Sequence, residues 1–194
     1  FILRGSATAG LLTSPWHVVP NTFFVLIALI FFILYHRFKK LADTASTATL
    51  TSLYLYAIWG VCSIVYILGY GFDPQLHIAS SLFIFSHGSI DPITPMYLTQ
   101  YSIVNTVAHL FGLPIVGIVK HLSPIIASTL LPYALYLFLL DKKITRHTAL
   151  FTLTLLPLFI AKEFIATTPY NLSIIFSLSA LCFSGMAQKP EKKL

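Results

Sequence analysis

The stretch VVPNTFFVLIALIFFILYHRFKK, residues 18–40, decides the structural class of this chain. Its first part, 18–35, contains no charged side chain, whereas Arg37, Lys39 and Lys40 follow directly. A helix that crosses the hydrocarbon core of a membrane needs about 20 mainly apolar residues. The stretch therefore predicts a membrane-spanning helix that ends in a basic cluster.

The rest of the chain repeats this pattern. Of its 194 residues, 57% are hydrophobic and only 9% are charged, and the mean hydropathy is +0.84. A soluble domain carries about a quarter charged residues. We therefore predict an all-α, polytopic integral membrane protein in which residues 1–194 form a single transmembrane domain, as part of a longer protein. Five spans are expected, at residues 18–35, 50–68, 124–140, 149–161 and 174–186.

Residues 73–86 are too polar to span a membrane. On a helix, Asp73, His77, Ser80 and Ser81 form one stripe, because they stand at positions i, i+4, i+7 and i+8. Apolar residues such as Leu76, Leu82 and Phe83 cover the remaining surface. This pattern predicts an amphipathic helix that lies on the membrane surface and directs these apolar residues toward lipid or the helix bundle. Asp73 and Pro74 suit the start of such a helix.

Residues 96–119 allow two interpretations, because Gly112, Pro114 and Gly117 interrupt an apolar stretch. They form either one kinked span or two short segments near the surface. The distribution of cations favours the second interpretation. If 36–49, 141–147 and 187–194 are cytoplasmic, nine of the twelve Lys and Arg residues lie inside, as the positive-inside rule requires. We therefore expect 69–122 to be an extracytoplasmic region with a re-entrant or surface-bound segment. The three cations left outside are Arg4, Lys120 and Lys162.

The formal net charge of +6 does not indicate a nucleic-acid partner, because the cations flank apolar runs as topology signals do. Cys62 and Cys182 lie inside apolar runs, where free cysteines pack as small hydrophobic residues. We expect the protein in the cytoplasmic membrane of a prokaryote, in contact with membrane lipid.

The stretch GYGFDPQLHIASSLFIFSHGSIDPITPMYLTQY, residues 69–101, is the best candidate for chemistry. Carboxylates are costly in hydrocarbon, so Asp73 and Asp91 belong at an interface, in a cavity or at a functional site. Asp73, Asp91, His77 and His87 together offer oxygen and nitrogen ligands for a divalent metal, although their spacing matches no established motif. The structural alternatives are a helix cap for Asp73 and a turn for Asp91.

This region resembles the first extracytoplasmic loop of GT-C polytopic membrane glycosyltransferases. In that family a spanning helix leads to an acidic residue, then to amphipathic juxtamembrane helices and a helix containing Pro and Tyr. The matching pieces are ILGYGFD at 67–73, the helix at 74–86 and HLFGLP at 109–114, with Pro92, Pro95, Tyr97, Gln100 and Tyr101 between them. The resemblance covers roughly residues 50–145.

The resemblance implies transfer of a sugar from a polyprenyl-phosphate donor to an acceptor at the extracytoplasmic face. Asp73 would act as the general base on the acceptor, or as a metal ligand. His77, Asp91, Tyr97, Gln100 and Tyr101 are candidate substrate-binding residues, and Lys162 is a candidate for the donor phosphate. The alternative is a non-enzymatic polytopic protein, either part of a transporter or flippase or an assembly subunit. Tyr97, Gln100 and Tyr101 would then be interfacial anchors, and Lys162 would extend to the surface beside Glu163.

Overall fold

The computed structural model describes residues 14–40, 44–67, 69–71, 73–89, 97–159 and 164–187, without the side chains of residues 44 and 45. These residues form nine α-helices and no sheet, which confirms the all-α class for this part of the chain. The helices are α1 (Pro15–Val18), α2 (Asn21–Lys39), α3 (Thr44–Trp59), α4 (Val61–Val65), α5 (Asp73–His87), α6 (Leu98–Phe111), α7 (Ile115–Asp141), α8 (Arg146–Phe159) and α9 (Pro169–Ala187).

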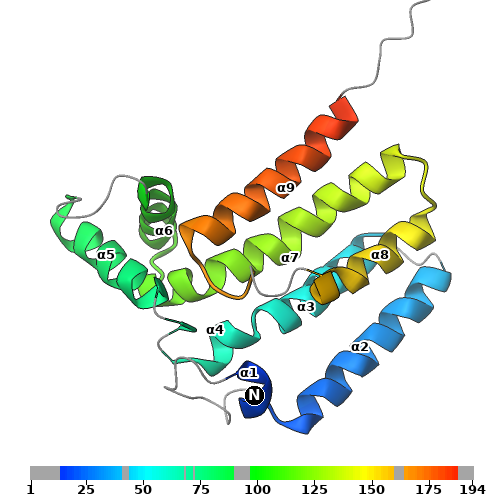
Figure 1. Cartoon of the computed structure of the whole chain (residues 1–194), viewed down its shortest axis with the longest axis horizontal. Helices are drawn as coiled ribbons and strands as arrows, with labels where there is room; N and C mark the ends of the chain where they lie inside the picture. The colour runs from blue at the N-terminus through cyan, green and yellow to red at the C-terminus, as the bar shows by residue number, and fades with distance from the viewer. Residues whose placement is uncertain are drawn as a thin grey trace, which may run out of the picture.

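Five helices form a bundle in which α2, α7 and α9 run in one direction and α3 and α8 run in the other (Figure 1). α7 packs against α3, α8 and α9. The main core holds fully buried Leu34, Leu55, Trp59, Phe164 and Ile175, contributed by distant parts of the sequence. The rings of Trp59 and Phe164 meet edge to face with their centroids 5.0 Å apart, an arrangement that aromatic pairs prefer.

Three of these helices, α2, α7 and α9, are long and apolar enough to cross a membrane. They lie at the predicted spans 18–35, 124–140 and 174–186, although α7 begins nine residues earlier than expected. Most of α2 faces outward: only 17% of its most apolar 18-residue window is buried, and side chains such as Val25 and Phe32 are exposed. An apolar surface of this extent is typical of a helix that contacts lipid or a partner.

The other two predicted spans are shorter or broken. The span expected at 50–68 consists of α3 and α4, which are separated at Gly60, and the chain becomes extended at Tyr66. Gly60 is required at this break, because a Cβ there would lie 2.6 Å from the Tyr56 carbonyl oxygen. The span expected at 149–161 is α8, a helix of 14 residues. Neither α3, with 16 residues, nor α8, with 14, is by itself as long as the helix of about 20 residues that crosses a membrane.

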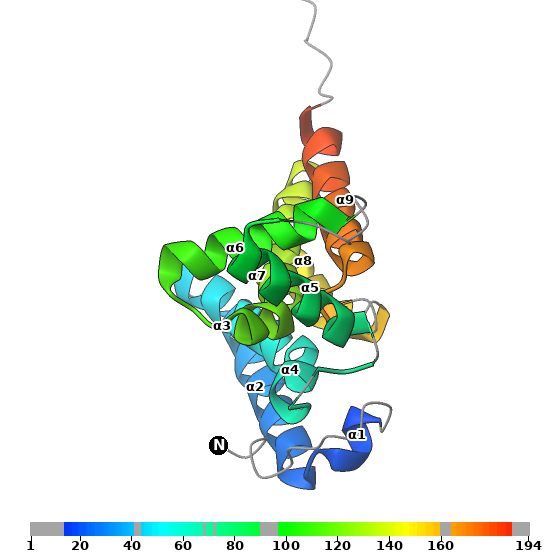
Figure 2. The ribbon, with the colours of Figure 1, turned by 90° about the vertical axis from the view of Figure 1, so that its left-hand side faces the viewer.

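α5 and α6 lie across one end of the bundle, transverse to the five long elements (Figure 1). Figure 2, viewed from that end, shows both helices in front of the bundle. α6 ends at Gly112, whose left-handed φ of 61° allows the turn before α7 begins at Ile115. The described part of 96–119 is therefore two helical segments and not one kinked span. The helix predicted at 73–86 is α5, and its transverse direction agrees with the prediction of a helix that lies on the membrane surface.

The polar stripe of α5 faces outward only in part, whereas a surface helix would expose all of it: Asp73 is exposed and Ser80 is half-buried. His77 and Ser81 are buried, and α5 packs against α6 and α7. The apolar residues Leu76, Leu82 and Phe83 are exposed instead. His77 turns inward because Tyr101 on α6 offers it a hydrogen-bond partner. The expectation that the polar stripe faces outward is therefore wrong at His77 and Ser81, whereas the exposed apolar residues agree with the expected contact with lipid.

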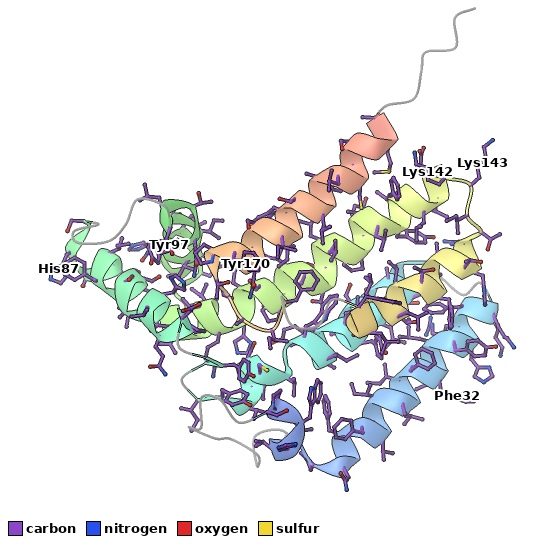
Figure 3. The ribbon with its side chains drawn as sticks, viewed as in Figure 1. Phe32, His87, Tyr97, Lys142, Lys143 and Tyr170 are labelled. Atoms are coloured by element: carbon purple, nitrogen blue, oxygen red, sulfur yellow. The ribbon has the colours of Figure 1, made fainter. Side chains whose placement is uncertain are left out.

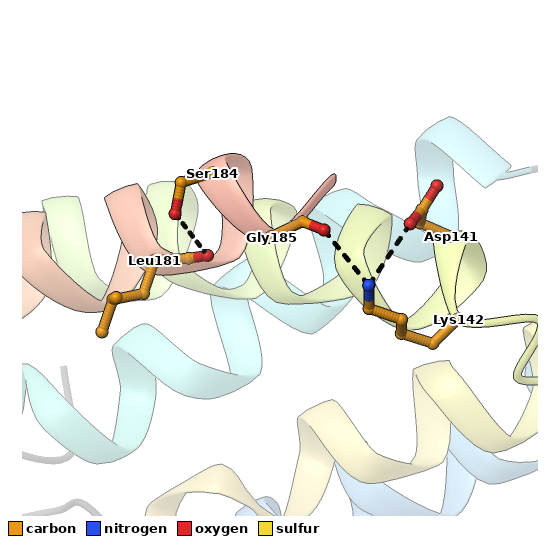
Figure 4. Close-up of polar contacts among 5 residues, drawn as sticks. All are labelled: Asp141, Lys142, Leu181, Ser184 and Gly185. Carbon is orange, nitrogen blue, oxygen red and sulfur yellow. Dashed lines mark hydrogen bonds and ion pairs between the residues drawn. The ribbon is translucent and has the colours of Figure 1, made fainter. Parts of the chain in front are cut away.

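The basic clusters gather at the opposite end of the bundle, where Lys142 and Lys143 lie (Figure 3). We call this the basic end; it comprises residues 36–40 and 141–147 and the C-terminal turn of α9. Lys142 Nζ donates a hydrogen bond of 3.1 Å to the Gly185 carbonyl oxygen and lies 3.7 Å from an Asp141 carboxylate oxygen (Figure 4). The two basic clusters thus share one end of the fold, as the charge pattern predicted.

Candidate functional site

The candidate site lies at the end of the bundle opposite the basic end. We call it the transverse end; it comprises α5, α6, the first turns of α7 and the segment 164–168. Asp73 is the first residue of α5, and its side chain is exposed. His77 follows one helical turn later and is only 6% exposed. The acidic group is therefore open to a ligand, while the imidazole is held inside the fold.

α5 and α6 bring three of the predicted residues together. His77 Nδ1 lies 3.1 Å from the Tyr101 hydroxyl oxygen, a hydrogen bond between residues 24 positions apart in sequence. The Tyr97 ring meets the His77 ring edge to face, with centroids 5.3 Å apart. Figure 3 shows Tyr97 between the two helices. The structure thus forms one His-Tyr-Tyr cluster from residues that the sequence offered separately.

Burial lowers the pKa of His77, and the nearby Asp73 carboxylate opposes this effect only in part. His77 is therefore a neutral imidazole at pH 7. In this form one ring nitrogen accepts a hydrogen bond and the other donates one, and the tautomer decides which role Nδ1 has toward Tyr101. A neutral histidine with a fixed ring can orient a neighbouring group or pass a proton.

Gln100 has a different environment from Tyr97 and Tyr101. It is buried, and its Nε2 donates a hydrogen bond of 3.4 Å to the Thr167 carbonyl oxygen. The Ser123 backbone N–H donates to Thr167 Oγ1 over 2.9 Å. These two bonds connect α6 and α7 to the segment before α9. In this conformation Gln100 ties elements of the site together.

Unpaired polar groups are concentrated at the transverse end. Eight buried side-chain polar atoms have no hydrogen-bond partner in the described part of the chain, and four of them lie here: Ser81 Oγ, Gln100 Oε1, Asn105 Oδ1 and Ser123 Oγ. Nearly all buried polar groups in native proteins are paired with protein or water. This concentration indicates that water or a ligand supplies the missing hydrogen bonds at the transverse end.

Lys120 is a candidate site residue that the motif analysis did not select. It is the single Lys or Arg between residues 69 and 122. Its Nζ donates to the Ile67 carbonyl oxygen over 3.3 Å, and it lines a cavity of about 10 Å³ with Pro74, the residue after Asp73. A lone cation inside an apolar stretch was the signal that could have identified it.

Two predicted residues, Asp91 and Lys162, lie outside the described residues. Within the described ranges no group of three His, Cys, Asp or Glu side chains could hold a metal ion. His77 and His87 are ten residues apart on α5, which is about 15 Å along the helix axis. They therefore cannot bind the same ion, and the proposed four-residue metal set is wrong in that respect.

Comparisons of the chain with protein-family models, with curated proteins and with solved structures found no match. The functional argument therefore rests on the chemistry and placement of the residues at the transverse end.

Proposed function

We propose that this chain is the core membrane part of a GT-C-type glycosyltransferase, which moves a sugar from a polyprenyl-phosphate donor to an acceptor at the extracytoplasmic face. One observation carries the proposal. An exposed carboxylate, Asp73, opens a helix that crosses the end of the bundle, one turn before a buried histidine that is bonded to Tyr101. A second transverse helix, α6, packs against α5 at the same end of the bundle.

The proposed placement has five passes through the membrane. α2, α7 and α9 cross in one direction, and α3 with α4, and α8, return in the other. The basic end is cytoplasmic because Lys and Arg concentrate on that side of membrane proteins. The transverse end then faces the outside of the cytoplasmic membrane of a prokaryote, with α5 and α6 at the lipid surface.

The length of α7 supports a position for Lys120 near the outer surface in this arrangement. α7 has 27 residues and is therefore about 40 Å long, whereas the hydrocarbon core is about 30 Å thick. If Asp141 lies at the cytoplasmic surface, the core ends about 20 residues earlier, close to Lys120. A cation at this depth suits the phosphate group of a lipid-linked donor, a role for which Lys162 also remains a candidate.

The reaction needs a base and a stabilised leaving group. Asp73 takes the proton from an acceptor hydroxyl, and the acceptor oxygen forms a bond to the anomeric carbon of the donor sugar. The bond between that carbon and the phosphate oxygen breaks, and its electron pair leaves with the polyprenyl phosphate. Lys120 stabilises the negative charge that grows on the phosphate. Asp73 then releases its proton to water.

The test is an exchange of carboxylate for amide at each end of the fold. Asn caps helices nearly as well as Asp, so Asp73→Asn should leave α5 intact. Transfer from polyprenyl-phosphate hexoses to extracytoplasmic acceptors should fall about 100-fold or more, as is typical when a general base is lost. Asp141→Asn at the basic end is the matched control and should keep its rate.

Assays with added divalent metal and with chelator should be run on both variants. Unchanged transfer by Asp73→Asn would reduce Asp73 to a helix cap. Donor binding without turnover in the unmodified protein would favour the alternative, a non-enzymatic transporter or assembly subunit.

A further inference from the structure

A groove of about 400 Å³ lies between α5 and α6, beside the His77–Tyr101 pair. This volume is within the range of small-molecule sites. One face of α6 supplies most of the lining: Tyr101, Ser102, Asn105, Thr106 and His109, whose spacing brings them together on the helix surface. This groove is distinct from the cavity that Lys120 lines.

The groove combines exposed hydrogen-bonding groups with a polar floor. Ser102 and Thr106 are exposed on α6. Tyr101 and Asn105, which are 3% and 8% exposed, form the floor. Asn105 Nδ2 donates to the Tyr101 carbonyl oxygen over 2.8 Å, whereas its Oδ1 has no partner among the described residues. A buried acceptor without a partner is the kind of group that a ligand hydroxyl or a water satisfies.

One aromatic ring of the lining, that of His109, is stacked on Phe85, which lies outside the lining. The rings of Phe85 on α5 and His109 on α6 stack with their centroids 4.4 Å apart and an interplanar angle of 20°. Both side chains are exposed. Small-molecule sites typically join apolar and aromatic walls to a few well-placed polar groups. A pyranose ring has matching surfaces, since it presents C–H groups on its faces and hydroxyls at its edge.

The charge of the lining separates this groove from a phosphate site. None of the described residues that line it is a Lys, Arg, Asp or Glu. A neutral polyhydroxylated ligand fits such a lining better than a phosphate or a carboxylate does. Tyr101 joins the groove to His77, whereas Asp73 lies eleven residues before Ile84, the α5 residue of the lining, which is about 16 Å along the helix axis.

We infer that the α5–α6 groove binds a neutral sugar, a unit of an acceptor glycan that lies away from the hydroxyl that Asp73 deprotonates. Ser102, Asn105 and Thr106 contact its hydroxyls, and the Phe85–His109 stack packs against its ring. The inference rests on the proposed function, because it assigns the acceptor to the same site. It makes the acceptor a glycan, and not an unglycosylated protein or lipid.

The probe is a set of methyl hexosides that carry a photoreactive diazirine, applied to the chain in lipid nanodiscs. A diazirine-bearing cyclohexane serves as the apolar control probe. Mass spectrometry of the cross-linked peptides should place the sugar label on 98–110, and unlabelled methyl hexoside should compete for it. Labelling should fall about tenfold in the double variant Ser102→Ala/Thr106→Val, which removes two hydrogen-bonding groups from exposed positions.

The matched control is Thr148→Val/Ser173→Ala, which removes two exposed hydroxyls from α8 and α9 and should label like the unmodified chain. Equal labelling by the cyclohexane probe, or a double variant that labels fully, would overturn the inference. Labelling should persist in Asp73→Asn, because that variant keeps the groove. If labelling meets these expectations but no variant or substrate shows transfer, the groove stands and the glycosyltransferase proposal fails. If transfer depends on Asp73 but unlabelled methyl hexoside does not compete for labelling, the glycosyltransferase proposal stands and the groove inference fails.

Discussion

The two ends of the bundle differ in how their polar groups are satisfied. At the basic end, cations bond to neighbouring helices: Lys142 Nζ donates to the Gly185 carbonyl oxygen, and Arg146 Nε donates to the Tyr136 hydroxyl over 3.0 Å. At the transverse end, the described residues include an exposed carboxylate, one cation, Lys120, and four unpaired buried polar atoms, together with a His-Tyr-Tyr cluster. Among the described residues the basic end has one unpaired buried atom, Arg37 Nε, whereas the transverse end has four, and we interpret this difference as room for a ligand at the transverse end.

Exchanging one lysine for glutamine at each end should give the largest effect after the Asp73 variant. Lys120→Gln removes the charge that we assign to the donor phosphate. A hydrogen bond to a charged group contributes about 1.5–3 kcal/mol, so the KM for the polyprenyl-phosphate donor should rise about 10- to 100-fold. Lys142→Gln should change it less than about twofold, because Lys142 lies at the opposite end of the bundle from the proposed donor site.

Steady-state kinetics at varied donor concentration separates KM from kcat for both lysine variants. Similar kinetics in the two variants would contradict the assignment of Lys120 to the donor phosphate. A larger rise in KM for Lys142→Gln would place the donor at the basic end.

Acid should destabilise the transverse end through His77, with a smaller effect than the charge exchanges. Burial lowers the pKa of His77 below its ordinary value of 6.5, so the unfolded chain binds the proton more readily than the folded chain does. Stability is therefore highest above pH 6.5 and decreases as the pH falls from 6.5 toward the lower folded pKa. Thermal unfolding of detergent-solubilised protein between pH 7.5 and 5 should show this decrease.

His77→Gln should flatten this pH dependence, because glutamine does not titrate and can still bond to Tyr101. His147→Gln at the basic end is the control and should keep the slope of the unmodified protein. An unchanged slope in His77→Gln would mean that His77 is not held neutral by burial.

The features that could be predicted are those that one continuous stretch of sequence encodes. The all-α class and the positions of α2, α7 and α9 follow from apolar runs that are long enough to be unambiguous. The start of α5 was also predictable, because Asp73 and Pro74 are a local helix-start signal. The break at Gly60 was not, since glycine is tolerated in apolar helices and only the close Tyr56 carbonyl shows the need for it.

The site was predictable as a list of residues but not as an arrangement. A polar stripe on a helix faces water or faces another helix, and the periodicity of α5 is the same in both cases. Only the packing of α6 shows that His77 turns inward to Tyr101. Gln100 shows a different difficulty. Its type and position suggested a ligand contact, whereas its side-chain amide donates a hydrogen bond to the Thr167 carbonyl oxygen, in a distant part of the chain.

The account depends most directly on the transverse end being outside the cell and the basic end inside. In a background without Cys62 and Cys182, Ser89→Cys and Ile144→Cys place one thiol near each end. A membrane-impermeant maleimide added to intact cells should label position 89 and leave position 144 unlabelled until the membrane is opened. Labelling of 144, with 89 protected, would place Asp73 on the cytoplasmic side and contradict an extracytoplasmic transfer reaction.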